Sequence, residues 1–173
     1  EPLGVITLLS QALMLVSYFL DGIAFAAGTY AGKFYGEGGR SGLSTLATVG
    51  GGLSVGLGVG FAIAFISFPQ SLFGLLTDHQ TVLSQLDGYV LWLLPVFSFG
   101  AIAFMLDGYF LGLTSGTVLR NSTVLATLVG FVPLAIVAYV RQSPHGLWLA
   151  LTCFMAIRAL TLVWAVPSSF KSA

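Results

Sequence analysis

The chain has 173 residues and no net charge, and 7% of its residues are charged while 57% are hydrophobic. A soluble domain carries roughly a quarter charged residues, so this composition, with a mean hydropathy of +0.98, excludes a soluble globular protein. Zero net charge also removes the electrostatic basis for binding nucleic acid. The single cysteine, Cys153, cannot form a disulfide within the chain.

Five apolar stretches are long enough to cross a hydrocarbon core of roughly 30 Å at about 1.5 Å per residue. We expect an all-α integral membrane protein, because lipid-facing backbone must satisfy its own hydrogen bonds and the apolar runs do not alternate as strands would. A short interfacial helix is expected near Ser71–Leu76. The predicted spans, which form one transmembrane domain over residues 1–173, are about 4–32, 43–67, 83–112, 118–140 and 146–166.

The basic residues of the loops predict the orientation of the chain. Lys33, Arg40, Arg120 and Lys171 would lie on one side of a five-span topology, and the opposite loops carry only Arg141. Because cytoplasmic loops are enriched in lysine and arginine, we expect the first residue outside and the C-terminus in the cytoplasm. The chain begins with Glu-Pro rather than Met, and its first apolar run is too long for a signal peptide, which indicates a fragment or a processed protein.

Small residues and prolines within the spans suggest how the helices pack and bend. Gly52, Gly56 and Gly60 recur at four-residue spacing, which predicts a stripe where two helix backbones approach closely. Such a stripe is typical of ordinary tight packing and also of surfaces that slide during transport. Pro95 and Pro133 lie inside the third and fourth spans and are expected to kink them, either as hinges or as simple bends.

The tripeptide Leu-Asp-Gly occurs three times, although aspartate costs about 2.5–3.5 kcal/mol at the centre of a membrane helix. Asp87 falls at the predicted outer end of the third span, where water can solvate it. Asp107 lies about 30 Å further along at helical rise, so we expect it near the cytoplasmic end, holding the helix end or meeting Arg120. Asp21 lies near the middle of the first span and should be protonated, paired or facing a watery cavity.

Arg158 is the basic residue that lies well inside a span, and its guanidinium needs a carboxylate, carbonyl groups or water. Either Asp21 or Asp107 would serve as its partner, and the sequence leaves that choice open. A role in a substrate or cation pathway and a structural bond between helices are both consistent with such charges. No catalytic motif and no metal-ligand spacing is present, so we expect neither an enzyme nor a metal site.

Three stretches resemble the multidrug and toxic compound extrusion (MATE) family of transporters, in particular its DinF-type branch. The stretch SYFLDGIAFAAGTYAGKFYGEGG is similar to the eighth helix of that family. The stretch LPVFSFGAIAFMLDGYFLGLTSGTVLRNS is similar to its tenth helix and the following loop, and HGLWLALTCFMAIRALTL to its twelfth helix. The resemblance covers essentially the whole chain and implies helices eight to twelve of a twelve-helix protein, which is most of its second lobe.

The resemblance implies a secondary active transporter without a cofactor, exporting amphipathic or cationic organic compounds by alternating access in exchange for protons or sodium ions. Its partners would be the lipid bilayer, a small organic substrate and the N-terminal lobe of the same transporter, in the inner or plasma membrane of a bacterium. Asp21, Asp107 and Arg158 would be the charged pathway candidates in this half. Two alternatives stay open: a truncated helical bundle that transports nothing, and a flippase for lipids or lipid-linked sugars, which a strongly basic cavity would favour.

Overall fold

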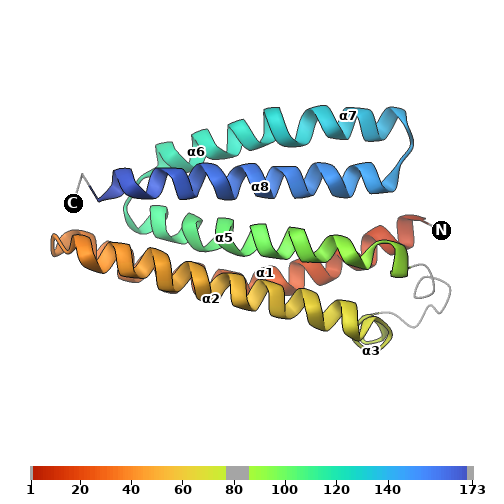
Figure 1. Ribbon diagram of the computed structural model, residues 1–173, viewed down its shortest axis with the longest axis horizontal. Helices are drawn as coiled ribbons and strands as arrows, with labels where there is room; N and C mark the ends of the chain where they lie inside the picture. Colours follow the sequence, from red (N-terminus) through yellow and green to blue (C-terminus); the bar gives the residue numbers. More distant parts are fainter. Residues whose placement is uncertain (1, 77–85, 171–173) are drawn as a thin grey trace.

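Five long helical segments run side by side in the computed structural model, which describes residues 2–76 and 86–170 (Figure 1). The long elements are α1 (Pro2–Gly36), α2 (Arg40–Ser67), α5 (Leu93–Gly112), the continuous series α6 (Gly116–Leu125), η3 (Ala126–Phe131) and α7 (Val132–Val140), and α8 (Pro144–Ser169). Every regular element in the described part is helical. The predicted all-α membrane fold is confirmed by five segments that are long and apolar enough to cross a membrane, namely Gly4–Gly36, Arg40–Ser67, Val90–Gly112, Gly116–Val140 and Pro144–Ser169.

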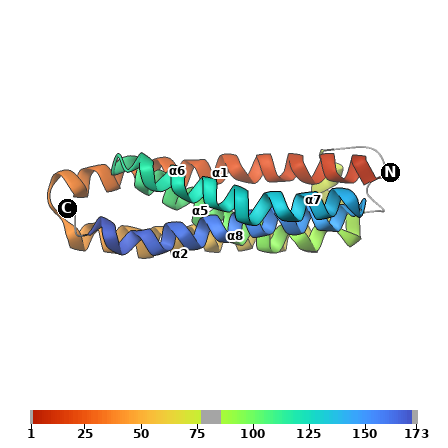
Figure 2. The same cartoon turned by 90° about the horizontal axis from the view of Figure 1, so that it is seen from above.

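The helix α5 is central, because it packs against α1, α2 and α8. Half of its most apolar window is buried, compared with 17–28% of the windows in the other four spans. Figure 2 shows α1 along one side of the bundle and α2 and α8 along the other. Buried side chains of α5, among them Phe97 and Tyr109, belong to two apolar clusters, one toward each end of that helix. The outer faces of the other helices are left for lipid or for further protein.

The basic residues of the described turns lie at the two ends of the bundle that a five-span topology predicts for them. Lys33 lies in the last turn of α1, Arg40 begins α2 and Arg120 lies in the second turn of α6, all at one end of the bundle (Figure 1). Arg141 follows α7 at the opposite end. Lys171 lies outside the described residues. The end that faces the cytoplasm stays a prediction.

The third span is shorter than the predicted range of about 83–112. The segment Val90–Gly112 begins with a turn of 3-10 helix, η2 (Val90–Trp92), and residues 83–85 lie outside the described part. Asp87 lies in the preceding 3-10 helix η1 (Leu86–Gly88), before the span begins, as expected for a boundary residue. A short helix, α3 (Pro69–Gly74), is present close to the predicted place, and its position at the membrane interface stays a prediction.

The two prolines behave differently. Pro95 is the third residue of α5, where the backbone amides of the first turn have no acceptor within the α-helix. A kink or hinge at Pro95 stays a prediction. Pro133 is the second residue of α7 and directly follows the π-helical segment η3, so the backbone there does depart from a regular α-helix. A hinge role for Pro133 stays a prediction.

The predicted packing stripe on α2 has no close neighbour at its three glycines within the described residues, so its role stays a prediction. A Cβ atom added to Gly52, Gly56 or Gly60 would meet nothing within 4 Å among the described residues. The close contact lies on another face, where a Cβ on Gly58 would be 2.6 Å from the carbonyl oxygen of Phe97 in α5. Four-residue spacing identifies a face of a helix, but α2 carries glycines on more than one face, and the position of α5 decides which face is packed.

Candidate functional site

The close approach of α1 to α5 builds the candidate site. A Cβ on Gly28 would lie 2.9 Å from the carbonyl oxygen of Gly108, and a Cβ on Gly32 would lie 3.2 Å from that of Gly112. Conversely, side chains on Gly108 or Gly112 would overlap the backbone of α1. Any side chain on Gly28, Gly108 or Gly112 would push the two helices apart, and one on Gly32 would make a tight contact. This crossing brings the Leu-Asp-Gly copies at Asp21 and Asp107 to one place.

A cavity of about 570 Å³ lies between these two helices, lined by five residues from each. Asp21, Phe25 and Thr29 contribute from α1, and Phe104 and Asp107 contribute from α5. The two carboxylates therefore share one cavity, although they are far apart in the sequence. Aromatic rings and small residues form most of the remaining wall. We call this space the Asp21 cavity.

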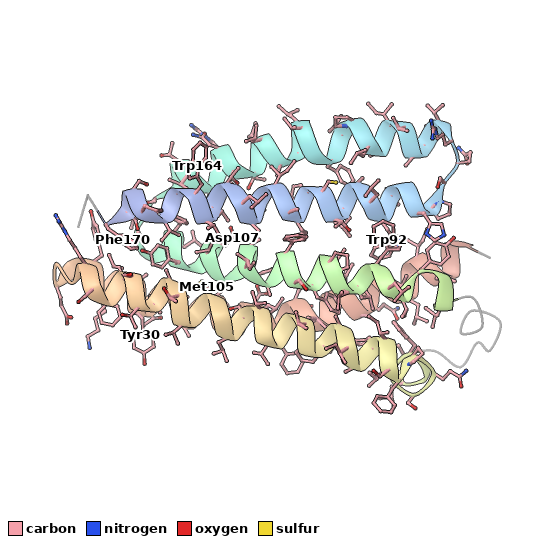
Figure 3. All side chains as sticks on the ribbon, in the orientation of Figure 1. Tyr30, Trp92, Met105, Asp107, Trp164 and Phe170 are labelled. Atoms are coloured by element: carbon pink, nitrogen blue, oxygen red, sulfur yellow. The ribbon has the colours of Figure 1, made fainter. Side chains whose placement is uncertain are left out.

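Asp107 is bound by Arg158 of α8. Arg158 Nη2 donates to Asp107 Oδ2 at 2.8 Å, and the side chains are 21% and 24% exposed, respectively. Figure 3 shows Asp107 between α5 and α8. The predicted partner Arg120 is therefore wrong: it lies near the start of α6, whereas α8 packs along α5 at the level of Asp107. Asp107 Oδ1 and Arg158 Nε have no hydrogen-bond partner among the described residues.

Asp21 differs from Asp107, since it makes no hydrogen bond or ion pair within the described part of the chain. It is partly exposed and lies on a face of α1 that also carries Gln11, Tyr18, Phe25 and Thr29. These positions are separated by three, four or seven residues, so they follow one side of a helix. Tyr18 is 73% and Phe25 is 79% exposed. A stripe that mixes polar and aromatic groups at membrane depth is typical of a cavity wall or a protein interface rather than of a lipid-facing surface.

Two other grooves lack charged residues in their walls. One of about 520 Å³ lies between α1 and α2 and includes Tyr30, and one of about 600 Å³ is bordered by α2, α5 and α8 and includes Phe170. Within the described residues, no group of three histidine, cysteine, aspartate or glutamate side chains is placed to hold a metal ion. The charged chemistry of the spans is therefore concentrated at the Asp21 cavity.

An aromatic cluster next to the start of α5, at the end of that helix away from Asp107, was not predicted from the sequence. Trp92 Nε1 donates to His145 Nδ1 at 3.1 Å, and the ring of His145 stacks on Tyr89 with centroids 4.4 Å apart. The cluster joins the start of α8 to the turn before α5 (Figure 3). The available signal was Trp92 itself, because tryptophan is enriched at membrane–water interfaces.

Comparison with known proteins places this bundle in a family. The chain matches the family model described as MatE over residues 1–140, which includes four of the five spans. The chain belongs to the MatE family. This membership confirms the resemblance stated above.

A relative of the DinF type is also similar. The DNA damage-inducible protein F of Escherichia coli (strain K12) is 32% identical over 168 residues, which cover 95% of this chain and 36% of that protein. This MatE-family chain therefore spans just over a third of the length of that relative. No solved structure matches the chain.

Proposed function

We propose that this chain forms one wall of the pathway of a MatE-family efflux transporter, which exports amphipathic or cationic organic compounds in exchange for protons or sodium ions. The observation that carries the proposal is the Asp21 cavity, which brings two carboxylates together within the spans. An isolated ionised carboxylate is costly at that depth, so it is occupied by a proton, a metal cation or a cationic substrate. Exchange among these occupants couples a gradient to export without any covalent step.

Aromatic groups around Asp21 support an organic cation as substrate. Tyr18 and Phe25 lie about one turn on either side of Asp21, and Phe104 faces the same cavity from α5. The faces of aromatic rings attract cations, and their surfaces bind the apolar part of an amphipathic molecule. A carboxylate with aromatic neighbours therefore suits a compound that is positively charged and largely apolar.

Asp21 is the residue that exchanges occupants in this proposal. Asp107 already has the guanidinium of Arg158 at 2.8 Å, whereas Asp21 has no such partner within the described residues. The open side of the cavity and the exposed stripe of α1 would face the N-terminal lobe of the complete transporter. The basic end of the bundle would face the cytoplasm, because loops rich in lysine and arginine are retained there.

A flippase for lipid-linked sugars is less well supported. Such cargo carries phosphate and calls for uncompensated basic groups in the cavity. The described lining of the Asp21 cavity contains no basic residue, and Arg158, which reaches Asp107 from α8, is already paired with that carboxylate.

The test is Asp21→Asn in the full-length protein, which keeps the shape of the side chain but removes its charge and its titration. Efflux of a fluorescent organic cation from proteoliposomes is measured under an imposed proton gradient and, separately, a sodium gradient. We expect Asp21→Asn to impair gradient-driven efflux while protein yield stays near normal. Asp87→Asn, before the third span, is the matched control and should transport normally. Intact efflux with a lower yield would make Asp21 a structural residue.

A further inference from the structure

Three charges lie together within the spans. Asp21 lines the cavity from α1, Asp107 lines it from α5, and Arg158 reaches Asp107 from α8 without itself lining the cavity. The other described charged side chains lie in or next to the turns at the two ends of the bundle. The guanidinium of Arg158 keeps its proton in proteins. Two carboxylates and one guanidinium leave this wall with a formal charge of minus one.

The position of Arg158 is set by α6 as well as by α8. The hydroxyl of Ser122 in α6 is hydrogen-bonded to that of Thr161 in α8 at 2.6 Å, and the Thr161 hydroxyl lies 2.8 Å from the carbonyl oxygen of Ile157 and 3.0 Å from that of Arg158. Ser122 is 4% exposed, so this tie between the two helices is buried. The backbone at Arg158 is therefore tied to α6 outside the cavity, by contacts that do not involve Asp21.

We propose that Arg158 is a specificity-determining residue: by neutralising Asp107, it leaves Asp21 as the single uncompensated charge and restricts this wall to singly charged cations. This inference rests on the proposed function, because it concerns the cations that the Asp21 cavity binds. A monocation brings the wall to neutrality. A dication leaves one positive charge uncompensated where the surroundings are apolar, which disfavours its binding. Arg158 acts through Asp107 and is a positioning residue, since the guanidinium does not line the cavity.

The experiment compares equilibrium binding of two probes to the purified full-length protein at one fixed pH. The monocation is tetraphenylphosphonium, and the dication is two triphenylphosphonium groups joined by a short alkyl chain. We expect wild type to prefer the monocation. Arg158→Met removes the charge but keeps an unbranched chain, and it should shift the ratio of the two dissociation constants toward the dication by at least about tenfold.

Two further variants keep the inference falsifiable if Arg158→Met folds poorly. The double variant Asp107→Asn, Arg158→Met again carries a formal charge of minus one, without any ion pair, and should return to the wild-type ratio. Asp107→Asn alone leaves a wall of zero charge and should bind both cations more weakly. A ratio in the double variant that differs from wild type would overturn the inference, and so would undiminished binding of the monocation by Asp107→Asn.

The outcomes separate this inference from the function on which it rests. If wild type binds neither probe, or if Asp21→Asn binds the monocation as tightly as wild type does, the proposed function fails and takes the inference with it. If Asp21→Asn abolishes binding of the monocation but the ratio is the same in Arg158→Met and in wild type, the function stands and the role given to Arg158 is wrong.

Discussion

Replacement of Gly58 by alanine tests the packing of α2 on α5. The added Cβ would lie 2.6 Å from the carbonyl oxygen of Phe97 and 2.8 Å from Cβ of Ala101, both closer than real Cβ contacts. The carbonyl oxygen belongs to the backbone and cannot rotate away, so the two helices must separate. Overpacking of this kind costs about 1–3 kcal/mol.

Gly56→Ala is the matched control, because Gly56 lies on the same helix and its Cβ would meet no described residue within 4 Å. The two substitutions share the gain in helix propensity from glycine to alanine, about 0.8–1.0 kcal/mol, which cancels when they are compared. The difference between them therefore measures the contact. At about 2–4 °C per kcal/mol, we expect the Tm of Gly58→Ala to be roughly 5 °C lower than that of Gly56→Ala.

The assay is thermal unfolding of the purified full-length protein in detergent, followed by the loss of the monodisperse peak in size-exclusion chromatography. Equal Tm values for the two variants would show that α2 and α5 do not approach as closely at Gly58 as the structure has them. A lower Tm for Gly56→Ala alone would instead restore the original interpretation of the stripe that runs from Gly52 to Gly60.

Three other predictions follow from single contacts. Asp107→Asn leaves the guanidinium of Arg158 without its counter-charge and should lower the free energy of unfolding by about 2 kcal/mol, a value reduced because the pair is partly exposed. Denaturation of this variant is compared with that of the double variant that also carries Arg158→Met. Equal losses of unfolding free energy in the two variants would contradict the prediction. His145→Ala removes the acceptor for the indole N–H of Trp92, so it should lower the free energy of unfolding by about 1 kcal/mol and change the fluorescence of the indole. An unchanged emission spectrum and an unchanged Tm would show that the hydrogen bond is not formed. A cysteine introduced at Gln142 should react with an impermeant maleimide added outside intact cells, and one at Arg40 should not; the reverse pattern would invert the orientation.

The membrane fold was determined by the sequence alone. Bilayer thickness sets the length of each span, and the absence of water in lipid requires helices, so apolar runs bounded by charged and glycine-rich turns were sufficient to predict five spans. The same local rules placed the short helix α3 and the boundary position of Asp87. Stretches such as LDGYFLGLTSG carried the resemblance to the MatE family.

The tertiary structure decided which groups meet. Asp21 and Asp107 were both possible partners of Arg158. The packing of α8 along α5 selects Asp107, and Asp21 is left without a partner among the described residues. Among the described residues, Gly58 rather than Gly56 is likewise the glycine of α2 that meets the backbone of α5, because the side on which α5 lies is a property of the whole bundle. Spacing along a helix identifies which residues share a face and how deep they lie in the membrane. The energy of a buried charge, or of the close packing at a glycine, depends instead on the neighbour that faces it. That neighbour comes from a distant part of the chain.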